Sequence, residues 1–80
     1  MTLAAIEKEW ADKARRYLKA ELKRAGLTYA ELAHRLRDHG IEDETEGSVT
    51  AKLARGTFSV TFFLACLAVL ELGGVQLSDL

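Results

Sequence analysis

The 80-residue sequence is poor in residues that interrupt helices and in residues that form cross-links. It contains no proline and a single cysteine, Cys66. Without proline, no position is barred from a helix interior on that ground, and one cysteine excludes an internal disulfide. The sequence also lacks an apolar run of about twenty residues and a signal-like N-terminal segment. We therefore expect one cytoplasmic domain that spans residues 1–80.

Net charge is almost absent as well, because 11 Lys and Arg residues face 12 Asp and Glu residues. This balance gives no overall signature of a nucleic-acid-binding protein. The distribution is uneven, however. Residues 13–37 hold eight basic and two acidic side chains, about +6, whereas residues 38–46 hold five acidic and no basic ones, about −5. The positive charge is thus concentrated in the first half of the chain.

Apolar residues recur at spacings of three and four, which predicts an all-α fold of four to five helices. The first helix should end before Gly26, with an inward stripe of Leu3, Ile6, Trp10, Ala14, Tyr17, Leu18, Leu22 and Ala25. Thr28 and Glu31 have capping-box spacing at the start of a second helix, which should stop near His39-Gly40. The inward residues of this second helix are predicted to be Ala30, Leu32, Ala33 and Leu36.

A third helix is predicted over about residues 46–55, after a second capping pattern in Asp43-Glu44-Thr45-Glu46 and with Val49 and Leu53 inward. The fourth, about residues 59–72, is apolar on all sides and should end at Gly73-Gly74. A small domain can bury one face of such a helix, so a second copy should cover the rest. The predicted homodimer interface consists of Phe62, Phe63, Leu67 and Leu70. Complete burial inside one subunit is the alternative.

Three stretches resemble the lambda-repressor-like (Cro-type) helix-turn-helix family. They are Leu27-Thr28-Tyr29-Ala30-Glu31-Leu32-Ala33, similar to L-T-Q-x-E-L-A, then Leu53-Ala54-Arg55-Gly56, similar to I-x-R-G, and Gly74-Val75-Gln76-Leu77-Ser78-Asp79-Leu80, similar to G-V-S-L-D-E-L. More narrowly, the chain from Trp10 onward resembles a group of small uncharacterised bacterial proteins with this domain. The resemblance implies a compact helix-turn-helix domain with its motif at about 27–56. The turn is about seven residues longer than the family pattern and is therefore enlarged.

The resemblance and the basic first half make double-stranded DNA the expected partner of a homodimeric transcriptional regulator, with the helix at about 46–55 in the major groove. The expected DNA-binding residues are Tyr29, Arg35, Arg37, Ser48, Thr50, Lys52 and Arg55. Against this, four carboxylates surround the helix end that should approach phosphate: Glu42, Asp43, Glu44 and Glu46. The alternative is a protein-interaction module that binds no DNA and presents these carboxylates to a basic protein surface.

No group of residues has the spacing of a catalytic or metal site. His34 and His39 are five residues apart, and no cysteine or carboxylate cluster completes a set of metal ligands. Cys66 lies in the most apolar stretch without a basic neighbour, so we expect it in the core. The sequence therefore predicts no enzyme activity, no catalytic residue, no metal and no cofactor.

Overall fold

Four helices make up the fold in the computed structural model, which describes residues 3–73, 75–76, 78 and 80, with side chains from Ile6 onward. They are α1 (Leu3–Ala25), α2 (Tyr29–Asp38), α3 (Glu46–Arg55) and α4 (Val60–Val69). The described residues contain no strand, which confirms the all-α prediction. The stretch Gly74-Val75-Gln76-Leu77-Ser78-Asp79-Leu80, which resembles the family's tail, falls partly on Gly74, Leu77 and Asp79, which lie outside the described residues.

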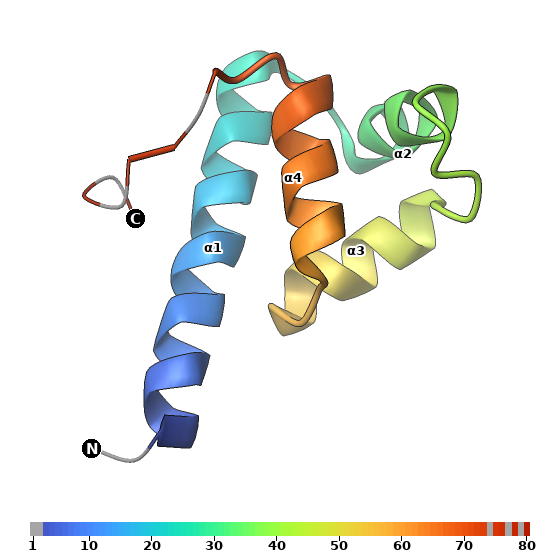
Figure 1. Cartoon of the computed structure of the whole chain (residues 1–80). Helices are drawn as coiled ribbons and strands as arrows, with labels where there is room; N and C mark the ends of the chain where they lie inside the picture. Colours follow the sequence, from blue (N-terminus) through green and yellow to red (C-terminus); the bar gives the residue numbers. More distant parts are fainter. Residues whose placement is uncertain (1–2, 74, 77, 79) are drawn as a thin grey trace.

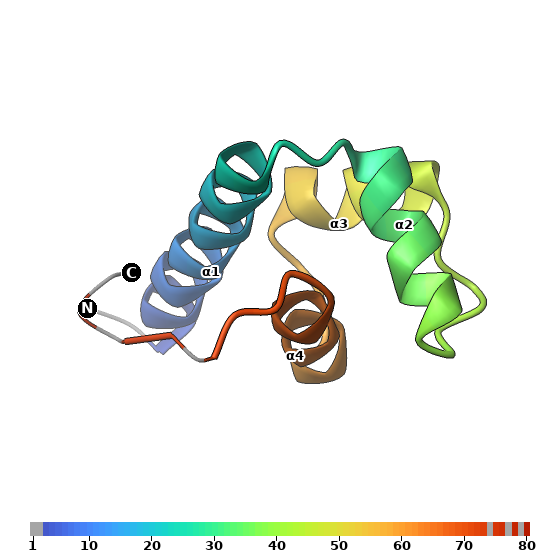
Figure 2. The same ribbon diagram turned by 90° about the horizontal axis from the view of Figure 1, so that it is seen from above.

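The helices are arranged around α3, which packs against both α1 and α2, while α4 covers the side left open by this group (Figures 1 and 2). The 23 residues of α1 give it a length of about 35 Å. This length accounts for most of the 40 Å long axis of the molecule. The N-terminal part of α1 extends past the ends of α3 and α4 (Figure 1). One end of α1 therefore has no partner helix.

The core is formed by one face of each helix. Its buried residues are Leu18 and Leu22 from α1, Leu32, Ala33 and Leu36 from α2, Val49 and Leu53 from α3, and Phe62, Cys66, Leu67 and Val69 from α4. The predicted inward residues of α2 and α3 are therefore confirmed except for Ala30, which is exposed. The predicted stripe of α1 is wrong at both ends, because Ile6, Trp10 and Ala25 are exposed. The side chain of Leu3 lies outside the described residues.

Local sequence signals set most helix ends. Thr28 and Glu31 form the predicted capping box of α2, with N–O distances of 3.1 and 3.2 Å. Gly56 ends α3 at φ +70°, a left-handed conformation that glycine adopts without steric cost. The end of α4 differs from the prediction. This helix stops at Val69 rather than near Leu72, and Glu71, not a glycine, takes the positive φ of 59°.

Candidate nucleic-acid interface

The outward side of α3 carries the residues that the sequence assigned to DNA. Ser48, Ala51, Lys52 and Arg55 are spaced by three, one and three residues, so they share one face of the helix. Together with Thr57 they line a shallow hollow. Thr50 lies outside this hollow and its Oγ1 donates a hydrogen bond to the Glu46 carbonyl at 2.7 Å. Of the four α3 residues predicted to bind DNA, the structure therefore brings Ser48, Lys52 and Arg55 together and leaves Thr50 apart.

The start of α3 is fixed by a capping box that differs from the predicted one. Thr45 is the N-cap, and its Oγ1 accepts a hydrogen bond from the backbone N–H of Ser48 at 3.1 Å. In return, the Ser48 hydroxyl accepts from the Thr45 N–H at 2.9 Å. Serine replaces the usual Glu or Gln at this position. Of the predicted pattern Asp43-Glu44-Thr45-Glu46, Thr45 is therefore the N-cap, while Asp43 and Glu46 take no part in the capping box.

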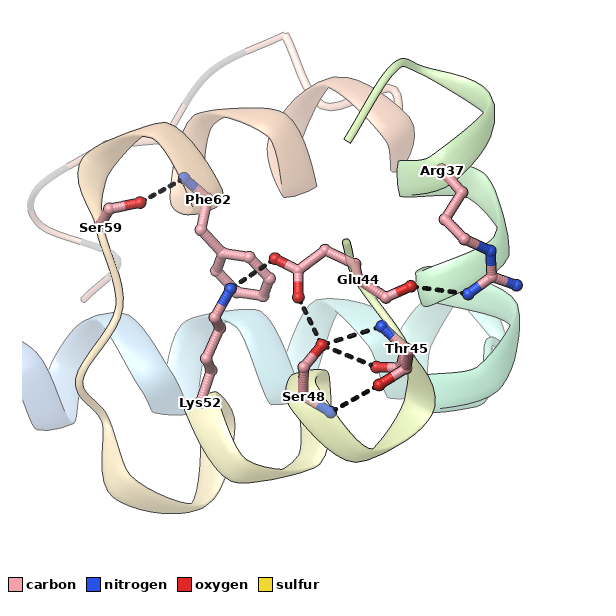
Figure 3. A network of polar contacts seen from close by, with 7 residues as sticks. All are labelled: Arg37, Glu44, Thr45, Ser48, Lys52, Ser59 and Phe62. Carbon is pink, nitrogen blue, oxygen red and sulfur yellow. Dashed lines mark hydrogen bonds and ion pairs between the residues drawn. The ribbon is translucent and has the colours of Figure 1, made fainter. Parts of the chain in front are cut away.

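Glu44 is buried, with 4% of its surface exposed, although the sequence placed it on an exposed acidic turn. Figure 3 shows its carboxylate turned toward α3 rather than toward solvent. One oxygen contacts Lys52 Nζ at 2.5 Å, and the other accepts a hydrogen bond from the Ser48 hydroxyl at 2.6 Å. A buried carboxylate is tolerated only when it is paired and hydrogen-bonded in this way. The expectation that Glu44 meets a basic partner surface is therefore corrected.

Lys52 is drawn inward by the same network. Its Nζ lies between the Glu44 carboxylate and the ring of Phe62 on α4, 4.7 Å from the ring centroid. A lysine ammonium over an aromatic face is attracted by the ring quadrupole. The side chain remains 35% exposed. Its charge is nevertheless compensated by Glu44, so Lys52 is a weaker phosphate ligand than the sequence suggested.

The network also involves the turn between α2 and α3 and the buried thiol of α4. Arg37 Nη1 donates a hydrogen bond to the Glu44 carbonyl at 2.7 Å, which ties the end of α2 to the turn (Figure 3). The pKa of the Cys66 thiol is raised from 9.0 to about 12, chiefly by burial and in smaller part by the charge of Glu44, while the charge of Lys52 acts in the opposite direction. The prediction that Cys66 is a core residue is confirmed, because it is fully buried.

The remaining predicted DNA-binding residues have different surroundings. Arg35 Nη1 donates to the Val69 carbonyl at 3.3 Å and so holds the end of α4. Tyr29 is partly buried against the core. Arg55 is exposed, and within the described part of the chain it forms no hydrogen bond or ion pair. Of the seven predicted residues, Arg55 therefore presents the most available charge on α3.

The sequence carries only part of the signal for this network. Ser48 and Lys52 are four residues apart and therefore share one face of α3, but Glu44 precedes the N-cap Thr45 and lies outside the helix. A carboxylate, a hydroxyl and an ammonium at these positions complement one another. The partner Phe62 has no such local signal, because its position depends on the turn from α3 into α4.

The predicted dimer residues also need correction. Phe62 and Leu67 are buried in the core of one subunit, so they cannot form an exposed interface. Phe63 and Leu70 are partly buried and pack against the same core. The large apolar side chains that α4 does expose are Val60 and Leu64. The sequence could not separate the buried from the exposed residues of α4, because this helix is apolar on all sides.

The described residues contain no group of three or more His, Cys, Asp or Glu side chains placed to hold a metal ion. Among these residues, no single helix has the length and apolar character needed to cross a membrane. Helices α3 and α4 meet those limits only when they are taken together, and they are bent by 117° at their junction.

These features define a small all-helical domain in which α1 and the N-capped helices α2, α3 and α4 pack around an apolar core. The chain belongs to the family described as Domain of unknown function (DUF6471), whose model matches residues 10–75. Neither a curated protein nor a solved structure matches the chain.

Proposed function

We propose that this chain is a DNA-binding domain of the helix-turn-helix type, in which α3 enters the major groove. The observation that carries the proposal is the placement of α3. Val49 and Leu53 are fully buried and anchor the helix, while Glu46, Gly47, Thr50, Ala54 and Arg55 remain exposed. A firmly anchored helix with small outward residues can approach base edges closely. The resemblance of Leu27–Ala33 and Leu53–Gly56 to the Cro-type motif supports the same function.

The buried network weakens the main electrostatic objection to this proposal. Four carboxylates at the start of α3 would repel phosphate, but Glu44 is buried and compensated by Lys52. Glu42, Asp43 and Glu46 remain exposed at that end. They are opposed by Arg55 at the far end of α3 and by Arg37, whose guanidinium is fixed by the Glu44 carbonyl. An arginine held in this way keeps other N–H groups for a phosphate oxygen.

Within the proposal, Arg55 is the principal phosphate contact and Thr50 is the base-edge candidate on α3. The hydroxyl of Thr50 donates to the Glu46 carbonyl, so it offers DNA its acceptor lone pairs and its methyl group. Ser48 has its hydroxyl engaged by the cap and by Glu44, so we assign it a structural role. The proposed role is binding, without catalysis.

The test is binding of the chain to random-sequence duplex DNA, measured by fluorescence anisotropy over a series of salt concentrations. The unmodified chain should bind with an affinity that falls as salt rises. Arg55→Ala should lower the slope of log affinity against log salt by about one. The matched control is Arg16→Ala, which removes the same charge from the side of α1 that faces the C-terminal tail. Undetectable binding at low salt would overturn the proposal.

One observation favours a second candidate function, a protein-interaction module on the same scaffold. Several large apolar side chains are exposed, among them Trp10 on α1 and Val60 and Leu64 on α4. Exposed apolar patches rimmed by polar residues mark interaction sites. A chain that failed to bind DNA and bound a protein partner through this surface would support the second function.

A further inference from the structure

Exposed apolar side chains gather on two neighbouring helices. On α4, Val60 is 73% exposed and Leu64 is 56% exposed, and they lie one turn apart on the same side of the helix. On α1, Ile6 and Trp10 have the same one-turn spacing, and Trp10 is 45% exposed. Single exposed apolar residues are ordinary in proteins, but two adjoining pairs form a patch.

A shallow groove connects one residue of each pair. It runs between α1 and the start of α4 and is lined by Trp10, Ala14, Phe58, Val60 and Phe63. Ile6 and Leu64 lie one helical turn from Trp10 and Val60 and extend the apolar surface beyond the groove. Aromatic rings pack together in this groove. The rings of Phe58 and Phe63 are stacked, with centroids 6.2 Å apart and planes at 4°. Tyr17 and Phe63 bridge α1 and α4 with ring centroids 6.4 Å apart. We call this combined surface the α1–α4 groove.

We propose that the α1–α4 groove is the interface of a homodimer, in which Val60 and Leu64 of each copy pack into the groove of the other. The surface is self-complementary, because projecting side chains on α4 stand directly beside a groove of matching apolar character. A two-fold axis near the start of α4 can therefore satisfy both copies at once. This inference does not rest on the proposed DNA binding.

The charges around the groove favour a second copy over a charged partner. Helix α4 contains no charged residue, so two copies of it meet without like-charge repulsion. The rim on α1 carries both signs, with Glu7 and Asp12 near Lys8, and with Lys13 Nζ 4.6 Å from the centroid of the Trp10 ring. Mixed rim charges can pair across a two-fold axis. A strongly basic or acidic partner would find no complementary potential here.

The apolar patch needs its polar rim to complete an interface. The largest apolar patch on a typical monomer covers about 300–600 Å². A stable interface buries about 800 Å² on each partner, so the polar rim must contribute the rest. We therefore expect a reversible dimer whose formation depends on concentration.

Trp10 is the only tryptophan in the chain and lies in the proposed interface, so it reports dimer formation directly. The first experiment combines sedimentation equilibrium of the unmodified chain with fluorescence, both from about 1 to 500 µM. Dimer formation should shift the Trp10 emission to shorter wavelength and reduce its quenching by iodide over the same concentrations at which the mass doubles. A monomer throughout this range would overturn the proposal.

The second experiment tests the location of the interface. Leu64→Glu and Val60→Glu each place a carboxylate in the interface twice, once per copy, and should raise the dissociation constant at least about a hundredfold. Both residues are exposed in the monomer, so circular dichroism should show an unchanged helix content. The matched control is Ala30→Glu, an exposed position on α2, which should leave the dimer intact. A dimer that survives both groove variants would have another interface, and the proposal would be wrong.

Discussion

The start of α3 and the start of α4 contrast in how they treat polar and apolar side chains. At the start of α3, the carboxylate of Glu44 is buried and its charge is compensated by Lys52. At the start of α4, Val60 is largely exposed although it belongs to the most apolar helix. The difference shows that residue type alone does not decide burial. A charged residue can be buried where partners at fixed spacing satisfy it, and an apolar residue stays exposed where the fold has no element left to cover it.

Removal of the buried Glu44 carboxylate should have the largest effect on stability. Glu44→Ala deprives Lys52 and Ser48 of their shared partner and leaves a cavity. Removing one member of a buried pair costs about 3–5 kcal/mol, and the partial exposure of Lys52 should reduce this to about 2–3 kcal/mol. Urea unfolding followed by circular dichroism measures the change. This is a large share of the stability of an 80-residue domain, about 4–12 kcal/mol.

Two controls separate burial from residue type in that experiment. Glu42→Ala removes an exposed carboxylate two residues earlier and should change the unfolding free energy by less than about 0.5 kcal/mol. Leu64→Ala, measured at a concentration at which the chain is monomeric, should also cost less than about 0.5 kcal/mol, since the side chain is exposed. If Glu44→Ala cost no more than these two variants, the ionic network would contribute nothing to stability.

The sequence predicts a structural feature correctly when the residues that cause it are close together along the chain. The capping box of Thr28 and Glu31 and the glycine end of α3 at Gly56 are determined within a few residues, and both were predicted correctly. The same holds for the inward positions Val49 and Leu53, which follow helical spacing. For these features, short-range hydrogen bonds and periodicity are sufficient.

The features that sequence reasoning missed depend on how helices meet. Glu44 is buried because the turn before α3 folds it onto Lys52 and α4, and no pattern within the turn specifies that contact. In α4, apolar residues point in every direction, so periodicity could not separate buried Phe62 from exposed Leu64. Trp10 follows the predicted stripe of α1, but the start of α4 beside it covers the ring only in part. The place at which α4 begins relative to α1 decides how far Trp10 is exposed.

The second prediction concerns Gly56, which ends α3 and begins the segment that leads into α4. At φ +70° an alanine is strained, and its Cβ would meet Arg15 Cδ at 3.3 Å. Gly56→Ala should therefore lower the unfolding free energy by about 1–2 kcal/mol. Gly47 is the matched control because it lies inside α3, and a Cβ there meets Thr45 Oγ1 at an ordinary 3.8 Å. Gly47→Ala should stabilise the chain by about 0.5–1 kcal/mol in the same unfolding assay. Equal effects of the two changes would contradict the assigned backbone conformations.

The third prediction concerns the dependence of the unfolding free energy on pH, which the buried thiol of Cys66 on α4 should affect. Burial, with the charge of Glu44, raises the pKa of Cys66 from 9.0 to about 12. The folded chain therefore holds this proton more tightly than the unfolded chain does. The resulting stability is fully present below pH 9 and is lost as the pH rises toward 12. By pH 10 the loss should be about 1 kcal/mol.

Comparison with Cys66→Ala isolates this effect from the lysines and tyrosines that titrate over the same pH range. The unfolding free energy of the unmodified chain should fall more steeply above pH 9 than that of the variant. Parallel pH profiles for the two proteins would show that the thiol does not titrate differently in the folded and unfolded chains.

The smallest expected effect comes from the acidic residues that remain exposed beside the network. Glu42 and Asp43 are exposed, and the cap of α3 is formed by Thr45 and Ser48, so the double change Glu42→Gln, Asp43→Asn should leave the fold intact. If α3 binds DNA, removing two repulsive charges should tighten binding to random-sequence duplex DNA about threefold at low salt. If the partner is a basic protein surface, the same change should slow association instead.

The control for this change removes two charges elsewhere, by Glu9→Gln together with Glu71→Gln at exposed positions on α1 and after α4. A general effect of net charge would tighten DNA binding equally in both double variants, whereas local repulsion beside α3 acts only in the first. Fluorescence anisotropy at several salt concentrations distinguishes the two, because a local electrostatic effect shrinks as salt screens it. Weaker DNA binding by the Glu42→Gln, Asp43→Asn variant would contradict the repulsion and favour a protein partner for the acidic turn.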